Sequence, residues 1–259
     1  MMRSMGKWEQ SILLQHNPQV VNHIPETLTY SEENLDDLLN RYPSVYVKHD
    51  TTGQGRAIFK IRKRSGGSYY VNGFTIQGTS IQKSISRVDE IQQLLHPFIK
   101  LGRVSGLYII QEEIQSYTQK GQPFSIRVHI QKLNNNWVIG GMYGMCGTTE
   151  TNLVTESGIV NPHTGAEVMT VSEVLSLTKF KANQKDTVRK IEEVAIAAAE
   201  VIHSILPNRE YGIDFGVNQE GTPIIFEVNT TPSIRSFAKI ENKAIWRRIV
   251  EIRKMQSES

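Results

Sequence analysis

Residues 210–233 read EYGIDFGVNQEGTPIIFEVNTTPS, and this stretch decides the fold. Two runs rich in apolar residues flank a Glu-Gly turn at 220–221, which predicts a β-hairpin. A two-residue loop at this turn places Asp214 opposite Glu227 on the neighbouring strand. Asn229 falls on the same face as Glu227, because side chains alternate between the two faces of a strand. The predicted hairpin therefore gathers two carboxylates and one amide on one face.

The polar side chains of this hairpin favour a metal site. The segment 223–229 is apolar on both faces, which is typical of a covered strand. Two carboxylates about 5 Å apart repel each other and need a cation on such a face. Hard oxygen ligands suit Mg²⁺, which takes one or two carboxylates and completes its shell with water and nucleotide phosphates, and Mn²⁺ is the alternative ion. The competing interpretation is a pair of exposed hairpin acids that bind nothing.

The composition is that of an ordinary globular protein. Its 259 residues suffice for one large or two modest domains, with 39% hydrophobic and 21% charged residues. The single cysteine, Cys146, excludes an internal disulfide framework and agrees with a reducing compartment. No apolar segment follows the first basic residues, as a signal peptide would require, and no apolar run approaches the ~20 residues of a membrane span. We therefore expect a cytoplasmic protein without membrane partners.

A basic run, KIRKR at residues 60–64, is the densest charge cluster of the chain, whose net charge is +3. Such a run can contact nucleic acid or an anionic ligand. More often it is the solvated end of a hairpin, and the Gly-Gly turn that follows favours this interpretation. Nucleic acid is therefore not the expected partner.

Hydrophobic periodicity predicts an α+β protein of two lobes with antiparallel sheets. Apolar residues at helical spacing predict a helix from 185 to 206, and Ser31 is the expected N-cap of a helix that Pro43 ends. Helices are also expected at 7–15, 87–99 and 239–254, with strands at 44–50, 56–64, 68–74, 75–82, 106–114, 124–133 and 137–147 and a frayed tail at 254–259. The predicted parts are an N-terminal helical segment (1–44), a small lobe (45–113) and a large lobe that carries the hairpin (114–259).

Asp214 lies on one predicted strand, Glu-x-Asn at 227–229 on the next, and a proline follows shortly after. In this arrangement the chain resembles the ATP-grasp superfamily, for which it is the metal-binding signature, and within it the endospore coat-associated YheC/YheD type. The matching segments, in order from Lys7 to Ser233, are KWEQSILLQ, IPET, VYVKHDTTGQGRAI, YIIQEEI, PFSIRVHIQK, WVIGGMY, TNLVTESG, YGIDFGV and IIFEVNTTPS.

The resemblance implies a nucleotide site between the two lobes. Lys48 ends a strand before a turn that contains Gly53 and Gly55, where a lysine and backbone N–H groups can hold phosphates. Lys7 stands where the superfamily has an earlier phosphate-contacting lysine. The alternatives are a plain hairpin with an exposed lysine and an ordinary lysine that begins a helix.

The segment IIQEEI corresponds to the connector that binds adenine in the superfamily. Main-chain groups near Glu112 and Ile114 would contact the adenine edge, Gln111 its exocyclic amine, and Glu113 or Glu112 the ribose hydroxyls. The alternative for either acid is a surface position at a strand end.

Two further residues are implied at the phosphate and acceptor end of the site. Arg127 lies within an apolar strand and needs an anionic partner if it is buried. The resemblance makes it a contact of the γ-phosphate or of an acyl phosphate. Asn152 would border the phosphate and acceptor region, and Asp214, Glu227 and Asn229 would bind the metal.

The expected function is an ATP- and Mg²⁺-dependent ligase that joins a carboxylate to an amine through an acyl phosphate, with both substrates unidentified. Two alternatives remain: kinase-like phosphoryl transfer to a hydroxyl, and a nucleotide-binding structural protein of the spore coat without turnover. The resemblance also implies association with the developing spore.

Overall fold

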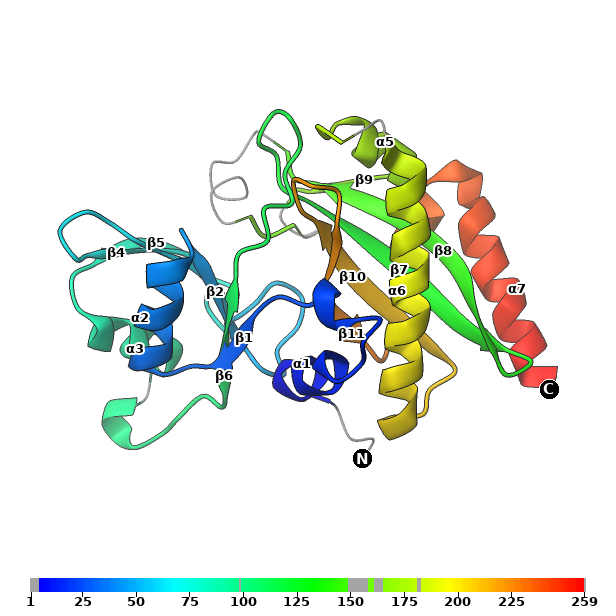
Figure 1. Cartoon of the computed structure of the whole chain (residues 1–259). Coiled ribbons are helices and arrows are strands. Elements are labelled where there is room, and N and C mark those ends of the chain that lie inside the picture. The colour runs from blue at the N-terminus through cyan, green and yellow to red at the C-terminus, as the bar shows by residue number, and fades with distance from the viewer. Residues whose placement is uncertain (1–4, 98, 149–157, 161–164, 181–182, 259) are drawn as a thin grey trace.

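The computed structural model describes residues 5–97, 99–148, 158–160, 165–180 and 183–258. They form two α+β lobes that lie side by side (Figure 1). The α-helices are α1 (Lys7–Gln15), α2 (Glu32–Arg41), α3 (Val88–Leu95), α5 (Val171–Ser176), α6 (Gln184–Ile205) and α7 (Ala244–Glu258). The 3-10 helices are η1 (Val21–His23), η2 (Ile99–Leu101), η5 (Arg235–Lys239) and η6 (Glu241–Lys243). The strands are β1 (Thr27–Thr29), β2 (Val45–His49), β3 (Ile58–Lys63), β4 (Tyr69–Phe74), β5 (Ser80–Ile85), β6 (Tyr108–Glu112), β7 (Phe124–Leu133), β8 (Asn136–Cys146), β9 (Glu167–Met169), β10 (Glu210–Val217) and β11 (Pro223–Asn229).

The small lobe is built on a six-stranded antiparallel sheet in the order β1-β6-β2-β3-β4-β5. Helices α2 and α3 supply Leu35, Leu38 and Ile91 to its core, together with inward-facing strand residues such as Val47. The Ser31 hydroxyl accepts from the Asn34 backbone N–H, which confirms the predicted N-cap of α2.

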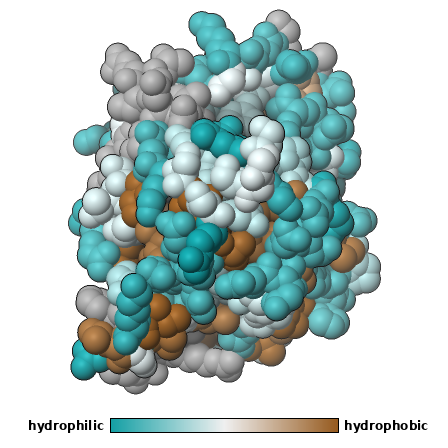
Figure 2. Space-filling model, turned by 90° about the vertical axis from the view of Figure 1, so that its left-hand side faces the viewer, coloured by the Kyte–Doolittle hydropathy of each residue, from teal (hydrophilic) through white to brown (hydrophobic). Residues whose placement is uncertain are grey.

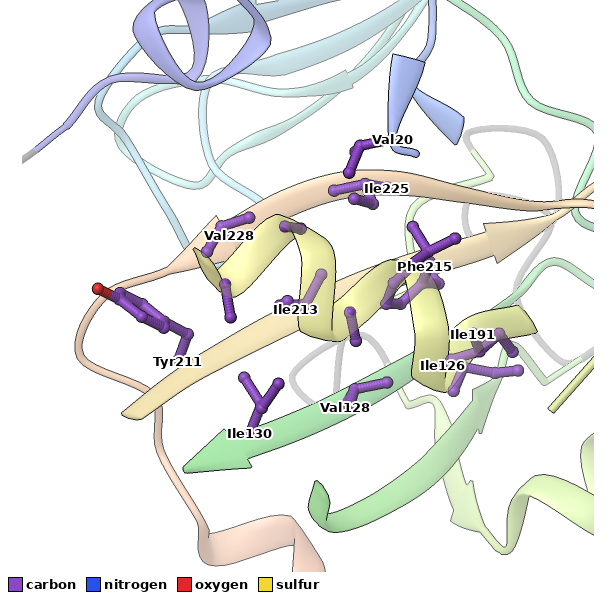
Figure 3. Packing of buried hydrophobic residues seen from close by; sticks show 14 of the residues in the cluster. Val20, Ile126, Val128, Ile130, Ile191, Tyr211, Ile213, Phe215, Ile225 and Val228 are labelled. Carbon is purple, nitrogen blue, oxygen red and sulfur yellow. The ribbon is translucent and has the colours of Figure 1, made fainter. Parts of the chain in front are cut away.

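The large lobe is built on a five-stranded antiparallel sheet in the order β11-β10-β7-β8-β9. Helix α6 lies along one face of this sheet (Figure 3) and its apolar stripe meets the apolar side chains of the central strands. Buried residues of this contact include Ile191 on α6, Ile126 and Val128 on β7, and Ile213 and Phe215 on β10.

The opposite face of the same sheet is polar along β7, because its alternate residues are Ser125, Arg127, His129 and Gln131. Helix α7 and η5 cover the part near His129 and Gln131, and the Gln131 amide donates to the Ile249 carbonyl. Ser125 and Arg127 line a cavity between the lobes. The sequence pattern of β7 thus positions the candidate site.

The N-terminal residues do not form a separate helical segment. Helix α1 packs on α6 and β11 of the large lobe, with Leu14 in that lobe's core. Strand β1 instead pairs with β6 at the edge of the small-lobe sheet, and α2 packs into the small-lobe core. The region expected as one unit at 1–44 is therefore divided between the two lobes.

The C-terminal tail is helical rather than frayed, since α7 continues to Glu258. Gln256 is buried and its amide donates to the carbonyls of Lys132 (2.9 Å) and Arg209 (2.8 Å), which fixes the last turns to the sheet. None of the described helices is long and apolar enough to cross a membrane.

The basic run at 60–64 differs in part from a solvated hairpin end. Lys60 is buried and its ammonium lies 2.5 Å from the Glu113 carboxylate. Lys63 and Arg64 are exposed, and Lys63 pairs with Asp36 at 2.7 Å. The end face of the small lobe is mostly hydrophilic, with smaller apolar patches (Figure 2).

Candidate functional site

A cavity of about 730 Å³ lies between the lobes. This volume is in the range of small-molecule sites, about 300–1,000 Å³. The small lobe contributes β2, the loop at 52–56 and the connector at 111–116, and the large lobe contributes β7, β8, β10, β11 and η5. Apart from Glu113 and from Asn152, which lies outside the described residues, all the residues expected at the site line this cavity: Lys7, Lys48, Gly53, Gly55, Gln111, Glu112, Ile114, Arg127, Asp214, Glu227 and Asn229.

The hairpin of β10 and β11 places Asp214 directly opposite Glu227, which confirms the predicted pairing. Asn229 lies on the same face, and its amide Nδ2 donates to Asp214 Oδ2 over 3.1 Å. The side chains of Asp214 and Glu227 retain 18% and 28% exposure, so both carboxylates remain reachable from the cavity.

The predicted two-residue loop of this hairpin is wrong. The Asn218 N–H donates to the Thr222 carbonyl, and Gly221, with φ +82°, closes a three-residue loop. A β-bulge between Asp214 and Phe215 then shifts the register back by one residue. The Asp214–Glu227 pair results from two opposite one-residue deviations from the expected hairpin.

Each hairpin acid is held by a cation of the chain. Arg127 stands beside Asp214 on β7, and its guanidinium donates to both carboxylate oxygens, with Nη2 at 2.7 Å from Oδ2. Lys7 Nζ lies 3.4 Å from Glu227 Oε1. Burial acts to lower the pKa of Arg127, but the adjacent Asp214 outweighs it and raises this pKa above its ordinary value. The structure thus supplies countercharge to two acids that would otherwise repel each other.

These residues fit a hard divalent cation. Two carboxylates and an amide oxygen on paired strands form an all-oxygen set, which is the preferred chemistry of Mg²⁺. The described residues contain no group of three or more His, Cys, Asp or Glu side chains that could hold a metal ion, so the set at the hairpin is limited to two carboxylates and one amide. Asp214, Glu227 and Asn229 are therefore the candidate metal ligands of the described part of the chain.

Lys48 lies on β2, across the cavity from the hairpin, and its Nζ donates to Gln111 Oε1 over 2.6 Å. The ring of Phe226, the extra residue of the β-bulge, has its centroid 5.7 Å from this ammonium. Burial, together with the charge of Lys7, lowers the pKa of Lys48 to about 8, while Glu227 acts in the opposite direction. A desolvated lysine that lines the cavity, and to which no described carboxylate is hydrogen-bonded, is well placed to bind an anion.

The connector directs its two acids differently. Glu112 lines the cavity, and its carboxylate accepts from the Glu26 backbone N–H over 2.9 Å. Glu113 does not line the cavity and pairs with Lys60. Burial acts to raise its pKa, but Lys60, together with the hydrogen bonds from Ser44 and Tyr117, outweighs this and the net pKa is lowered. Of the two acids expected at the ribose, the geometry leaves Glu112. The Gln111 oxygen accepts from Lys48 and its Nε2 donates to Thr27, which leaves one acceptor and one donor position of this amide, so its contact with the exocyclic amine stays a prediction.

The loop after β2 has the form of a phosphate-binding turn. Gln54 and Gly55 have φ values of +63° and +70°. A Cβ added at Gly53 would meet nothing within 4 Å, so this position faces open space. Backbone N–H groups in such left-handed turns form concavities that attract anions.

Helix α1 joins this loop to the hairpin of β10 and β11, a role that was not predicted. The Gln10 amide is buried and pairs with the backbone of Val228 in both directions, at 3.0 Å and 2.9 Å. At the start of the helix, the Trp8 N–H donates to Asp50 Oδ1 (2.7 Å) and Lys7 Nζ donates to the Thr52 carbonyl (2.8 Å). The signal available in the sequence was the helical spacing of Gln10 and Leu14, since a polar residue on an apolar face must find partners.

Two antiparallel α+β lobes that enclose a cavity, with basic residues and a glycine loop facing an acid hairpin, define an ATP-grasp protein. The chain is similar in fold to the D-alanine-D-alanine ligase of Coxiella burnetii, with a TM-score of 0.53 and 13% identity, over 98% of this chain and 59% of that one. The model of the YheC/D-like ATP-grasp family matches residues 2–253, and the chain belongs to this family. It is also 26% identical over 241 residues to the endospore coat-associated protein YheD of Bacillus subtilis, and spans 49% of the length of that relative.

Proposed function

We propose that the chain is an ATP-dependent ligase that activates a carboxylate as an acyl phosphate and transfers it to an amine. The observation that carries the proposal is that Lys7, Lys48 and the glycine loop line the same cavity as the Asp214–Glu227 hairpin. This arrangement can hold a triphosphate and its cation between the lobes. The ATP-grasp family and the ligase fold support the same assignment.

The proposed roles follow from position. The connector at Glu112 and Ile114 binds the base and ribose, and Lys7 and Lys48 bind phosphates with the backbone of the loop at 53–55. Asp214, Glu227 and Asn229 would hold Mg²⁺, which when bound neutralises phosphate charge and polarises the transferring group. Arg127, next to Asp214, would hold the transferring phosphoryl group and the carboxylate of the acid substrate. Asn152 is proposed to border the same region.

The reaction balances without a protein nucleophile. A carboxylate oxygen of the acid attacks the γ-phosphorus, the bond between that phosphorus and the bridging oxygen breaks, and ADP leaves. The amine nitrogen then attacks the acyl carbon, the bond from this carbon to the phosphate oxygen breaks, and the nitrogen loses a proton. Positioning and electrostatic stabilisation suffice for both steps.

The test uses hydroxylamine in place of the unidentified amine, because it captures acyl phosphates as hydroxamates. The protein is incubated with MgATP, hydroxylamine and pooled carboxylic and amino acids, and hydroxamates and ADP are measured by mass spectrometry. We expect ADP and a hydroxamate to form together, and both to be lost in Glu227→Gln. A phosphorylated hydroxyl compound in place of a hydroxamate would indicate a kinase instead.

We further propose that the protein acts in the cytoplasm in association with the spore coat. The similarity to an endospore coat-associated protein supports this location. The test is fluorescence microscopy of a tagged chain in a sporulating host. We expect the signal at the forespore surface. Signal spread evenly through the cell would contradict it.

A further inference from the structure

The cavity is uneven in charge along its length. Its described lining contains three carboxylates, of which Glu112 lies at the connector and Asp214 and Glu227 are each held by a cation. The end formed by η5 instead carries Arg235 and Lys239, and neither forms an ion pair with any described residue. Among the described residues, this end therefore has two positive charges without an ion-pair partner and no carboxylate.

Helix η5 fixes the backbone that carries these two cations, whose side chains are exposed. Phe237 is fully buried beneath it and contacts Tyr143 edge-to-face at a centroid distance of 4.7 Å. Arg235 and Lys239 are four residues apart, and both line the cavity. Two cations that line one cavity repel each other, and an anion bound by both would remove this repulsion and account for their placement.

The floor of the cavity connects this end to the proposed phosphoryl-transfer site. Strand pairing aligns Glu227, Asp214, Arg127 and Tyr143 in one row across β11, β10, β7 and β8. Adjacent strands are about 4.8 Å apart, so Tyr143 lies about 5 Å beyond Arg127 in this row. Phe237 packs against Tyr143, which places η5 at that end of the row.

We propose that Arg235 and Lys239 bind a second anionic group of the acid substrate, distinct from the carboxylate that is activated near Arg127. The substrate is then an acid with at least two anionic groups, separated by about one strand spacing or more. This inference rests on the proposed ligase function and narrows its substrate class. Arg235 and Lys239 are its specificity-determining residues.

The binding test compares dicarboxylates from succinate to pimelate with monocarboxylates of the same chain lengths, at equal ionic strength. Each acid is titrated into protein saturated with MgADP, and the melting temperature is recorded. We expect at least one dicarboxylate to stabilise the complex well beyond its monocarboxylate counterpart. Arg235→Gln and Lys239→Gln each weaken this binding by about tenfold to a hundredfold, the range for a lost charge-assisted hydrogen bond.

Matched controls are Arg248→Gln and Lys254→Gln on α7, which remove the same charges from exposed positions outside the cavity. Both should bind dicarboxylates like the unchanged chain. All four variants should retain the stabilisation by MgADP itself, because none alters the nucleotide end. The preference for dicarboxylates should also appear in the yield of hydroxamate, and should be lost in Arg235→Gln.

Two results would overturn the inference. The first is that monocarboxylates and dicarboxylates stabilise the complex equally, or that neither stabilises it. The second is that the preference for dicarboxylates persists in Arg235→Gln and Lys239→Gln. Failure of MgADP to stabilise the unchanged chain would instead contradict the proposed function. The two failures are therefore distinguishable.

Discussion

At the scale of single residues, the site is an arrangement of charges that neutralise one another. Asp214 is paired with Arg127 and Glu227 with Lys7, so removing one partner leaves the other incompletely compensated. The sequence predicted that the two acids face each other and need a cation. It did not predict that the chain supplies these cations itself, because Arg127 and Lys7 are distant from the hairpin in sequence.

Glu227→Gln tests the metal role against a purely structural one. Lys7 keeps its bond to the Thr52 carbonyl and Glu227 is partly exposed, so the free energy of unfolding without ligand should change by less than about 1 kcal/mol. Acid-dependent release of ADP from MgATP should fall by more than about a hundredfold, in the range seen for a lost group that stabilises charge in the transition state. Denaturant unfolding and ADP release are measured side by side. Undiminished ADP release would show that Glu227 has no role in catalysis.

Lys48 gives the site a defined pH dependence. Its folded pKa of about 8 lies below the ordinary value of 10.5, so between these values the unfolded chain binds more protons and stability rises with pH. Nucleotide phosphates favour the charged lysine, so MgATP binding near pH 8.5 should take up a fraction of a proton. Calorimetry in buffers of different ionisation enthalpy measures this uptake. Lys48→Arg should abolish it, because arginine stays charged, and uptake that survives in this variant must come from another group.

At the scale of elements, the sequence predicted most helices and strands because their apolar periodicity is strong. The register of the hairpin was predicted correctly through an incorrect loop, since the β-bulge left no signal in the apolar pattern. Strand β5 begins at Ser80 rather than at 75, because Thr75 to Thr79 form a turn around Gly78. Helix α5 was not predicted, although Thr170 and Glu173 form a capping box that the sequence displays as T-x-x-E.

Helix α1 should act on the site through its contact with β11. Gln10→Ala leaves the N–H and carbonyl of Val228 without their side-chain partner, and should destabilise the free chain by about 1–3 kcal/mol. Val228 lies between Glu227 and Asn229, so the variant should also bind Mn²⁺ or Mg²⁺ with ATP more weakly than its lower stability alone explains. Binding is measured by calorimetry well below the melting temperature. The control is Gln15→Ala, the same change at an exposed position of the same helix, and equal effects of both variants would exclude the proposed contact role.

At the scale of the whole molecule, the two lobes have separate cores, and the chain passes from the large lobe into the small lobe before β1 and returns after β6. The sequence pattern could separate two groups of strands, but not assign the N-terminal residues to a lobe, because α1 and β1 are short, with nine and three residues. Their division between the lobes places α1 against β11 while β1 extends the small-lobe sheet. The cavity is consequently bordered by segments from the whole length of the chain.

A nucleotide that contacts both lobes should stabilise them together. A ligand that binds only the folded chain raises the free energy of unfolding by about 2.7 kcal/mol when its concentration is a hundred times Kd. The melting temperature should therefore rise markedly with MgATP. Hydrogen exchange should slow in β2 and the loop at 52–56 of the small lobe and, at the same MgATP concentration, in β10 and β11 of the large lobe. ATP with a chelator should protect the small-lobe segments but much less the hairpin, since Asp214 and Glu227 require the cation to approach phosphates. Protection confined to one lobe, or an unchanged melting temperature at millimolar MgATP, would contradict binding between the lobes.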